Sequence, residues 1–319
     1  MACVRELNEA NAFLGDRKAL DRILQDQGYW FFRGVLDPDA VFEMRAQYDR
    51  VLAQWGLVRP DDPEPVWNGG SLAGIGDGLN NSRMPELRKK RVWETFVSNP
   101  KVNAFFESVL GPPLEWITSS DFYRLVPPTQ DLPEDPYKGR HQDGLGLQGL
   151  DFITCWIPLN TIDADVGGLA IATGSYSGSL YHERWFDPEL VKADGWARSD
   201  YHLGDVLMFV PTMMHSGLPN LSDRFRLSLD IRVLRPESPR PIYGTVVAID
   251  HRQVTIKDRA GKTETYLYQP GSHLRGMKPD SDIPVLVTAN EVPRYLPPGA
   301  EVLATSKDGR ILVLRPNQY

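Results

Sequence analysis

Apolar residues in the first third of the chain recur at helical spacing. In the segment 37–56, Asp37 is a typical helix N-cap and Pro38 suits the first helical position. The apolar side chains of this segment fall on one helical face and are Val41, Met44, Tyr48, Val51 and Trp55. Residues 99–111 repeat this arrangement, so we expect a helical part over residues 10–111.

From residue 114 onward the period of the pattern shortens to that of β-strands. Runs rich in β-branched and aromatic residues are separated by loops that contain glycine, proline and asparagine, with little helical pattern between them. Such runs occupy 114–126, 151–162, 167–176, 204–211 and 224–233. This order favours an antiparallel sandwich or barrel over a doubly wound parallel sheet, with the helices on one outer face.

After a proline-rich stretch at 234–241, the pattern of apolar and polar residues changes again. Short alternating segments and an Asp-Gly pair typical of a hairpin turn predict a few more strands. We therefore divide the chain into a main domain, 1–235, whose β core spans 114–235, and a small C-terminal β domain, 236–319, of unknown role.

Composition narrows the classes of function. The 319 residues carry a net charge of −7, and the single basic cluster, at 88–91, lies on a predicted helix where a solvated face explains it. A nucleic-acid partner is therefore not expected. No long apolar run or secretory leader pattern is visible, and two cysteines offer no disulfide framework. We expect a cytoplasmic protein with no membrane partner.

The segment GRHQDGLGLQ places His141 and Asp143 two residues apart. With 6 histidines and 42 acidic residues in the chain, about one such pair is expected by chance. On a strand, residues two apart point to the same side, so this pair offers two metal ligands. The best third ligand is His215, which ends an apolar strand just before a turn. A satisfied core histidine is the alternative interpretation of His215.

Two histidines and one carboxylate are typical of a facial triad that binds non-haem Fe(II) and leaves positions open for oxygen chemistry. The strand 225–233 adds a possible anion site. Its alternation predicts that Arg226 and Ser228 point into the barrel, while the apolar set packs on the helices. A buried guanidinium needs an anion, and a dicarboxylate co-substrate would supply one. The alternative is an internal ion pair between Arg226 and an acid such as Asp230.

A long insertion interrupts the strands at residues 182–202. Its aromatic and cationic side chains make it a candidate lid over a substrate pocket. The candidate substrate residues are Arg184, Trp185, Trp196 and Arg198. The alternative is that both tryptophans pack against the sheet.

Taken together, HQD, the run DFITCWIPLNTIDADVGGLAIATGSYSG and the run GDVLMFVPTMMHSGLPNLSDRFRLSL resemble the phytanoyl-CoA dioxygenase family of Fe(II)- and 2-oxoglutarate-dependent oxygenases. The resemblance covers roughly residues 10–235. It implies a mainly β fold with flanking helices, whose core is a double-stranded β-helix (a jelly roll, as in cupins). The C-terminal β appendage is not part of that family pattern.

The resemblance also implies roles for individual residues. His141, Asp143 and His215 would bind Fe(II), and Arg226 would pair with the distal carboxylate of 2-oxoglutarate. Ser228, Trp156 and Phe122 would line the co-substrate site. The family's basic residue before the second helical stretch has no clear counterpart, Arg83 being the nearest.

The activity implied is hydroxylation of a small organic molecule with O2 and 2-oxoglutarate, releasing succinate and CO2. A carboxylate at Asp143 favours hydroxylation, because related halogenases carry a small residue there to admit chloride. Desaturation, epimerisation or cyclisation by the same oxidising chemistry stays open, as do a cupin-like metal protein that uses no keto acid and a non-catalytic binding module. The appendage could support a homodimer.

Overall fold

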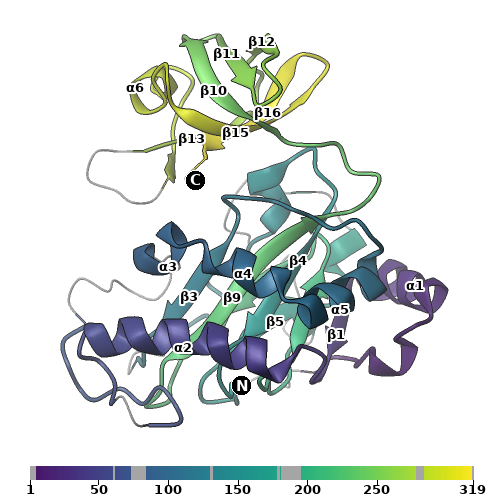
Figure 1. Cartoon of the computed structure of the whole chain (residues 1–319), viewed down its shortest axis with the longest axis vertical. Helices are drawn as coiled ribbons and strands as arrows, with labels where there is room; N and C mark the ends of the chain where they lie inside the picture. Colours follow the sequence, from purple (N-terminus) through teal and green to yellow (C-terminus); the bar gives the residue numbers. More distant parts are fainter. Residues whose placement is uncertain are drawn as a thin grey trace. The chain divides into compact units, whose positions relative to one another are not determined.

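The computed structural model describes residues 5–59, 62–72, 84–129, 132–177, 180, 195–277 and 284–317. The chain forms two compact units. The first combines Met1–Gln142 with Ile153–Arg235, and the second combines Asp143–Phe152 with Pro236–Tyr319. Figure 1 shows the elements of both units.

The two helices predicted in the first unit begin at the expected capping residues, Asp37 and Asn99. The Asp37 side chain accepts a hydrogen bond from the amide of Ala40, and the Asn99 side chain accepts from Lys101 and Val102. Both predicted helices are confirmed. The helices of this unit are η1 (Asn11–Phe13), α1 (Arg17–Gln27), α2 (Pro38–Gln54), α3 (Pro85–Lys89), α4 (Val92–Ser98), α5 (Pro100–Leu110) and η3 (Ser175–Ser177).

The larger sheet of this unit has six antiparallel strands in the order β1-β7-β4-β9-β2, with β3 also paired to β9. Its strands are β1 (Tyr29–Phe32), β2 (Glu115–Trp116), β3 (Phe122–Val126), β4 (Phe152–Pro158), β7 (Val206–Phe209) and β9 (Arg226–Leu234). Strand β1 lies inside the region predicted to be helical. Its four consecutive buried apolar residues show no helical period and pair with β7, which explains the difference.

The smaller sheet has the order β6-β5-β8. Its strands are β5 (Leu169–Ala172), β6 (Trp196–Ala197) and β8 (His215–Gly217). Side chains from the two sheets meet in one buried cluster, to which β1, β4 and β7 contribute on one side and β5 and β6 on the other. Two facing antiparallel sheets around a shared interior make a double-stranded β-helix, so the predicted fold class is confirmed.

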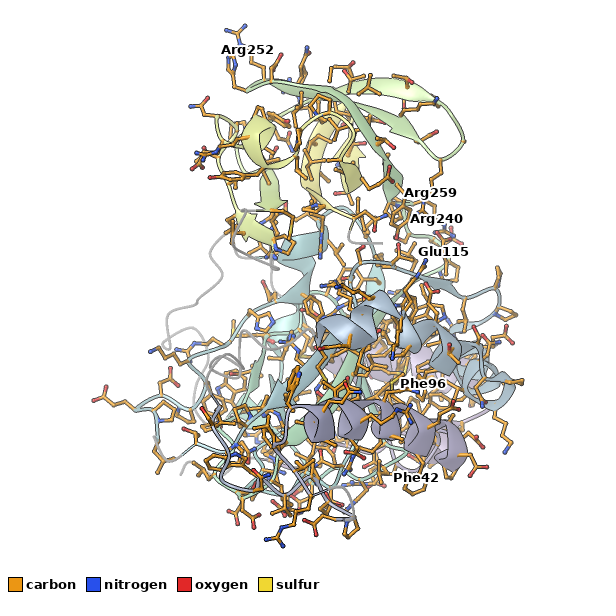
Figure 2. The ribbon with its side chains drawn as sticks, turned by 60° about the vertical axis from the view of Figure 1, so that its left-hand side comes forward. Phe42, Phe96, Glu115, Arg240, Arg252 and Arg259 are labelled. Atoms are coloured by element: carbon orange, nitrogen blue, oxygen red, sulfur yellow. The ribbon has the colours of Figure 1, made fainter. Side chains whose placement is uncertain are left out.

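The opposite face of the larger sheet is covered by helices (Figure 1). The odd-numbered residues of β9, from Leu227 to Val233, pack in one cluster with residues of α1, α2, α4 and α5. Figure 2 labels Phe96 of α4, which is buried in this layer, and Phe42 of α2, which is exposed. The even-numbered residues of β9 consequently point into the interior between the sheets.

The second unit is built on a seven-stranded sheet in the order β12-β11-β10-β15-β16-β13-β14. A further pairing of β12 with β16 draws part of the sheet towards a closed form. Its elements are η2 (Asp143–Leu147), β10 (Ile242–Ile249), β11 (Gln253–Asp258), β12 (Thr263–Leu267), β13 (His273–Met277), β14 (Pro284–Leu286), α6 (Val292–Tyr295), β15 (Glu301–Lys307) and β16 (Arg310–Pro316). The predicted Asp-Gly turn joins β15 to β16, and both turn residues have positive φ.

Residues 143–152 belong to the second unit through specific contacts. The Thr305 hydroxyl donates to the carbonyl of Gln148 at 2.6 Å, and the amide of Asp151 donates to the Ser238 hydroxyl at 2.9 Å. Gly149 has a φ of +86°, and a Cβ there would lie 2.6 Å from the Leu312 side chain. This segment therefore needs glycine both for its backbone conformation and for space.

No helix within the described ranges combines the length and the apolar composition that crossing a lipid bilayer requires.

Candidate functional site

The two predicted histidine ligands are brought together by backbone pairing. The amide of His141 donates to the carbonyl of His215, and the amide of His215 donates to the carbonyl of His141, both at 3.0 Å. This bridge adds His141 to the edge of the smaller sheet beside β8. The two imidazole ring centroids lie 4.3 Å apart.

Asp143 joins the two histidines. One ligand atom from each of His141, Asp143 and His215 lies within 4.8 Å of the others. The sequence analysis predicted that His141 and Asp143 share one face of a strand. In the structure His141 forms an isolated bridge, and Asp143 is the first residue of η2. A turn of the chain, and not a shared strand face, brings the carboxylate to the histidines.

The imidazoles are oriented as metal ligands require. Nδ1 of His141 lies 2.9 Å from the carbonyl oxygen of Gly139, and Nδ1 of His215 lies 3.0 Å from that of Met213. Because a carbonyl oxygen only accepts, each Nδ1 carries the proton, and the ring lone pair is therefore on Nε2. Metal-binding histidines show this arrangement, in which a backbone acceptor fixes the tautomer. The donor set therefore suits a divalent metal such as Fe(II).

Arg226 is a buried cation on the inward face of β9. One terminal nitrogen, Nη1, donates to the carbonyls of Gly168 and Leu218 at 2.9 and 2.8 Å. Nε is buried without a hydrogen-bond partner among the described residues. Burial, together with the nearby charge of Arg124, lowers the pKa of Arg226 to about 10.

The alternative partner for this arginine, Asp230, is engaged elsewhere. Its carboxylate accepts a hydrogen bond from Nε of Arg124 at 2.8 Å. Asp230 still favours the charged form of Arg226 from a distance, but the ion pair is formed with Arg124. The guanidinium of Arg226 therefore suits an anionic ligand from outside the chain.

Gly217 makes room for this guanidinium. A Cβ at Gly217, two residues after His215, would lie 2.9 Å from Nη2 of Arg226. A side chain there would push the guanidinium away from its carbonyl acceptors. The sequence pattern gave no sign of this requirement, because the contact joins two strands.

Ser228, Trp156 and Phe122 all come from inward positions of the larger sheet. The Ser228 hydroxyl is buried without a hydrogen-bond partner in the described structure. The Trp156 ring packs edge-on against Tyr201, with centroids 4.7 Å apart. Phe122 lies opposite Asp230 in the register of β3 and β9.

Two interior residues were missed by sequence reasoning. Arg124 is opposite Ser228 in the register of β3 and β9, and Tyr201 lies against Trp156. The alternation of residues 122–126 places Arg124 on the same face as Phe122, so this signal was available. Tyr201 follows a two-residue strand and offered no comparable pattern.

Two of the four candidate substrate residues, Trp196 and Arg198, lie in the described part of the chain. Trp196 is buried on the other face of the smaller sheet, where its ring stacks on Tyr137 at 4.0 Å between centroids. It packs against the sheet, as in the alternative interpretation. Arg198 forms an ion pair with Asp200 at 2.7 Å. Arg184 and Trp185, like Arg83, lie outside the described residues.

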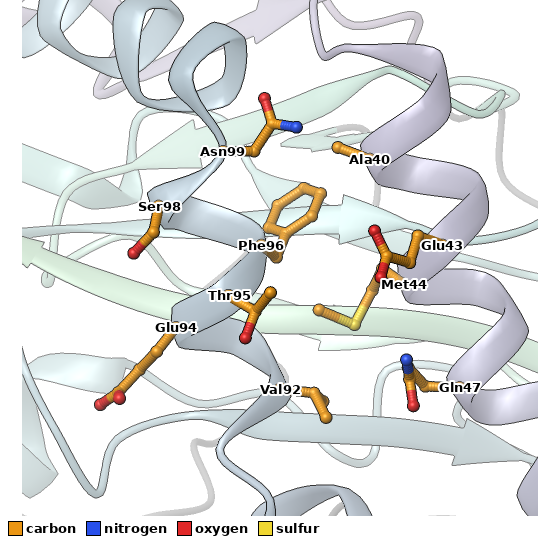
Figure 3. Close-up of a pocket in the computed structure, with 10 residues that line it drawn as sticks. All are labelled: Ala40, Glu43, Met44, Gln47, Val92, Glu94, Thr95, Phe96, Ser98 and Asn99. Carbon is orange, nitrogen blue, oxygen red and sulfur yellow. The ribbon is translucent and has the colours of Figure 1, made fainter.

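A cavity of about 540 Å³ lies between α2 and α4. Figure 3 shows its lining, in which Phe96 and Met44 lie between the two helices, and Glu43, Gln47 and Glu94 are among the polar lining residues. It shares no residue with the triad or with the interior of the β-helix.

The fold and the site together define a class. The double-stranded β-helix brings together two histidines of fixed tautomer and a carboxylate. It also holds a buried arginine whose Nε has no partner among the described residues. These are the features of a non-haem iron oxygenase that uses a 2-oxo acid. The phytanoyl-CoA dioxygenase (PhyH) family model matches residues 24–228, and the chain belongs to this family.

Characterised relatives are similar over most of the chain. The 1-deoxypentalenic acid 11-beta-hydroxylase of Streptomyces arenae is 30% identical over 251 residues, which cover 73% of this chain and 86% of that enzyme. The enzyme of the same name from Streptomyces exfoliatus is 28% identical over 252 residues and covers the same shares. Among solved structures, the non-heme alpha ketoglutarate dependent carbocyclase SnoK from nogalamycin biosynthesis aligns over 72% of this chain and 87% of its own, with 20% identity and a TM-score of 0.47.

Proposed function

We propose that this protein is an Fe(II)- and 2-oxoglutarate-dependent dioxygenase that hydroxylates an unactivated C–H bond of a small organic molecule, with release of succinate and CO2. One observation carries the proposal. The triad His141, Asp143 and His215, with both Nδ1 atoms already tied to carbonyls, is combined with the buried Arg226, whose Nε lacks a partner in the described structure.

Each residue has a definite task in this proposal. Bound Fe(II) and 2-oxoglutarate supply the oxidising chemistry, with O2 as the oxidant. His141 and His215 present Nε2 lone pairs to the metal, and Asp143 supplies a negative charge that stabilises a cation at this point. Arg226 orients the distal carboxylate of 2-oxoglutarate, and the Ser228 hydroxyl donates to that same carboxylate.

The aromatic interior would exclude water and position the co-substrate. Trp156 is buried, and its ring is fixed by Tyr201, whose hydroxyl donates to the carbonyl of Leu169 at 2.6 Å. Phe122 holds its place between two arginines, with Arg124 and Arg232 at 4.9 and 4.7 Å from its ring centre. Rigid aromatic walls of this kind hold reacting groups in one orientation.

Hydroxylation is favoured over the other outcomes of the same chemistry. The relatives from Streptomyces are named as hydroxylases, and Asp143 keeps the carboxylate that a hydroxylating site needs. The unpaired Nε of Arg226 favours a 2-oxo acid enzyme over a cupin-like protein without a co-substrate. The relatives' named substrate, a 1-deoxypentalenic acid, supports a small organic molecule as the substrate class.

We infer further that the partners of this chain are small molecules and not nucleic acid, and that it acts in the cytoplasm. The net charge of −7 and the absence of a disulfide at the buried Cys155 support this. A homodimer formed through residues 236–319 remains our proposal. Light scattering on the purified protein tests it, and a monomeric mass would refute it.

Anaerobic titration tests the proposed function. Addition of Fe(II) and 2-oxoglutarate should produce a weak visible absorption band near ~500 nm, as expected for a keto acid chelated to iron at an open facial triad. His215→Ala should abolish the band by removing a metal ligand. Arg226→Ala should preserve iron binding and weaken 2-oxoglutarate binding by roughly 10-fold to 100-fold, the loss typical of a hydrogen bond to a charged group.

Two results would contradict the proposal. Normal iron binding by His215→Ala would remove the triad, and undiminished 2-oxoglutarate affinity in Arg226→Ala would remove the carboxylate clamp. Arg17→Ala is a suitable control, because this half-exposed arginine of α1 forms an ion pair with Asp21 on the surface of its own helix.

A further inference from the structure

Arg226 is the first residue of β9, and the ends of strands are where pairing is weakest. Its backbone pairs with Val126 of β3 on one side, while the strand on the other side, β4, ends at Pro158. A displacement of the backbone at this point would move the whole guanidinium. An arginine that orients one end of a co-substrate therefore needs further contacts that hold its backbone.

The side chain of Asn160 holds the backbone on both sides of Arg226. Its Oδ1 accepts a hydrogen bond from the amide of Leu227 at 2.9 Å, and its Nδ2 donates to the carbonyl of Phe225 at 3.1 Å. A side-chain amide offers the same acceptor and donor groups as a peptide. Asn160 thus continues the pairing of β9 past the end of β4.

Asn160 is itself firmly fixed. It is fully buried, and its Nδ2 also donates to the carbonyl of Thr161 at 3.2 Å. The preceding residue, Leu159, donates its amide to the carbonyl of Leu227 at 2.9 Å and accepts from Nη1 of Arg45 at 3.0 Å. Because Arg45 is a buried residue of α2, this segment is held by the helical layer as well as by β9.

A second asparagine supports the same stretch from the side of β3. Nδ2 of Asn220 donates to the carbonyls of Val126 and Arg224, at 3.0 and 2.6 Å. Val126 is the register partner of Arg226, and Arg224 lies two residues before it. Asn220 and Asn160 are both fully buried, so the start of β9 is held from both neighbouring strands.

We propose that Asn160 is a positioning residue for 2-oxoglutarate. It holds the backbone before and after Arg226 and so determines where the guanidinium meets the distal carboxylate. This inference rests on the proposed function, which assigns that carboxylate to Arg226. Asn160 acts only through the arginine and does not touch the co-substrate. If Asn160 only closed the end of the sheet, its loss would lower stability without a selective effect on 2-oxoglutarate.

Asn11 provides a matched control. Its Oδ1 accepts from the amide of Arg33 and its Nδ2 donates to the carbonyl of the same residue, both at 2.8 Å. These bonds lie directly after β1, which is separated from β9 by β7 and β4. Replacing either asparagine by alanine therefore removes the same kinds of bond to the backbone, but only one replacement affects the start of β9.

The test compares five variants with the wild type: Asn160→Ala, Asn160→Ser, Asn11→Ala, Arg226→Ala and the double variant Asn160→Ala/Arg226→Ala. Anaerobic calorimetry measures the affinity for Fe(II) alone. Titration of the visible band of the Fe(II)-loaded protein measures the affinity for 2-oxoglutarate. Thermal denaturation without ligand measures the stability of each variant.

We expect Asn160→Ala to weaken 2-oxoglutarate binding roughly 3-fold to 30-fold, as for residues coupled in one hydrogen-bond network, with Fe(II) affinity unchanged. Asn160→Ser keeps a smaller polar group and should lose less. Asn11→Ala should lower the melting temperature and leave both affinities unchanged. In the Arg226→Ala background, loss of Asn160 should change 2-oxoglutarate affinity by less than about 2-fold, because the guanidinium that it positions is gone.

Several outcomes overturn the inference. Asn160→Ala could bind 2-oxoglutarate as tightly as the wild type, weaken Fe(II) binding equally, or keep its full effect in the Arg226→Ala background. An equal loss of 2-oxoglutarate affinity in Asn11→Ala would also refute it. If neither Asn160 variant folded while Asn11→Ala did, the role of Asn160 would be structural and the inference wrong.

Failure of the proposed function has a different signature. The wild type would then show no band that depends on 2-oxoglutarate, and Arg226→Ala would have no effect of its own. Asn160 would in that case have no co-substrate site to position, and the inference would fail together with the proposed function. A wild-type band that Arg226→Ala weakens and Asn160→Ala does not would refute the inference alone.

Discussion

His141 and His215 are hydrogen-bonded to each other through their backbones in both directions, at 3.0 Å each way. Their side chains are then anchored by carbonyls of their own segments, those of Gly139 and Met213. The positions of both imidazoles and their tautomers are consequently set by the polypeptide, before a metal is bound. Such an arrangement lowers the reorganisation that metal binding requires.

The metal-free protein should therefore already hold both histidines as the Nδ1–H tautomer. Nitrogen NMR of the protein labelled at histidine, recorded near pH 8 without metal, should show one protonated Nδ1 and one unprotonated Nε2 for each ring. The exposed His202 provides an internal comparison, because no backbone carbonyl of the described residues accepts a hydrogen bond from its ring. Rapid averaging of tautomers at His141 or His215 would contradict the prediction.

Arg226 should matter for the ligand more than for the fold. Replacing a buried charge by an apolar side chain of similar length is often neutral or stabilising, and here the loss of two bonds to carbonyls offsets part of the gain. We expect Arg226→Met to change the free energy of unfolding by about 1 kcal/mol or less and to abolish the thermal stabilisation by 2-oxoglutarate. Thermal denaturation with and without 2-oxoglutarate measures both effects. A variant that unfolds without ligand would refute the prediction.

The affinity for 2-oxoglutarate should depend on pH through Arg226. Its folded-state pKa is lowered to about 10, chiefly by burial, so the guanidinium is charged below this pH and loses its proton above it. Affinity should be level between about pH 7 and 9, where neither Arg226 nor the co-substrate carboxylates titrate, and should fall as the pH rises through about 10.

The lowered pKa of Arg226 also determines how the free energy of unfolding changes with pH. Between the folded and unfolded pKa values the unfolded chain binds more protons, so stability without ligand rises with pH in that range. Unfolding measured for the wild type and for Arg226→Met across this range isolates the contribution. If the free energy of unfolding of the wild type, relative to that of Arg226→Met, fell with rising pH, the lowered pKa assigned to Arg226 would be wrong.

Gly217→Ala should impair the co-substrate site without removing the metal site. The added Cβ would lie 2.9 Å from Nη2 of Arg226, and the flexible arginine would have to move. We expect the KM for 2-oxoglutarate to rise roughly 10-fold, about the value of one hydrogen bond to a charged group, with Fe(II) affinity unchanged. Gly146→Ala is a matched control, since a Cβ there meets nothing within 4 Å. Equal KM values in the two variants would argue against this role of Gly217.

The sequence predicted those features that depend on neighbouring residues in the chain, and it did not predict those that depend on contacts between distant residues. The alternation from Phe225 to Val233 identified the inward face of β9 and with it Arg226, because strand period alone decides that face. Helix caps such as Asp37 were equally readable. The sequence could not show which face of a two-residue strand Trp196 occupies, since its place depends on stacking with the distant Tyr137. Strand β1 was missed because four apolar residues have no period.

The proximity of His141 to Asp143 was predicted, but for an incomplete reason. The shared strand face of residues two apart does not apply, because η2 begins at Asp143 itself. The conformation of this segment depends on residues more than a hundred positions later, among them Thr305 and Leu312. Contacts between residues so far apart in the sequence cannot be predicted from the pattern of neighbouring residues.

The grouping of residues 143–152 with the second unit has a consequence for the history of this chain. A terminal appendage that only follows a domain can be gained or lost by a change at one end of a gene. Here Gly149 leaves space that Leu312 fills, and Thr305 binds the carbonyl of Gln148, so the two stretches of sequence are fitted to each other. Exchange of residues 236–319 between homologues would therefore require matched substitutions in 143–152, and the two stretches are expected to have evolved as a pair.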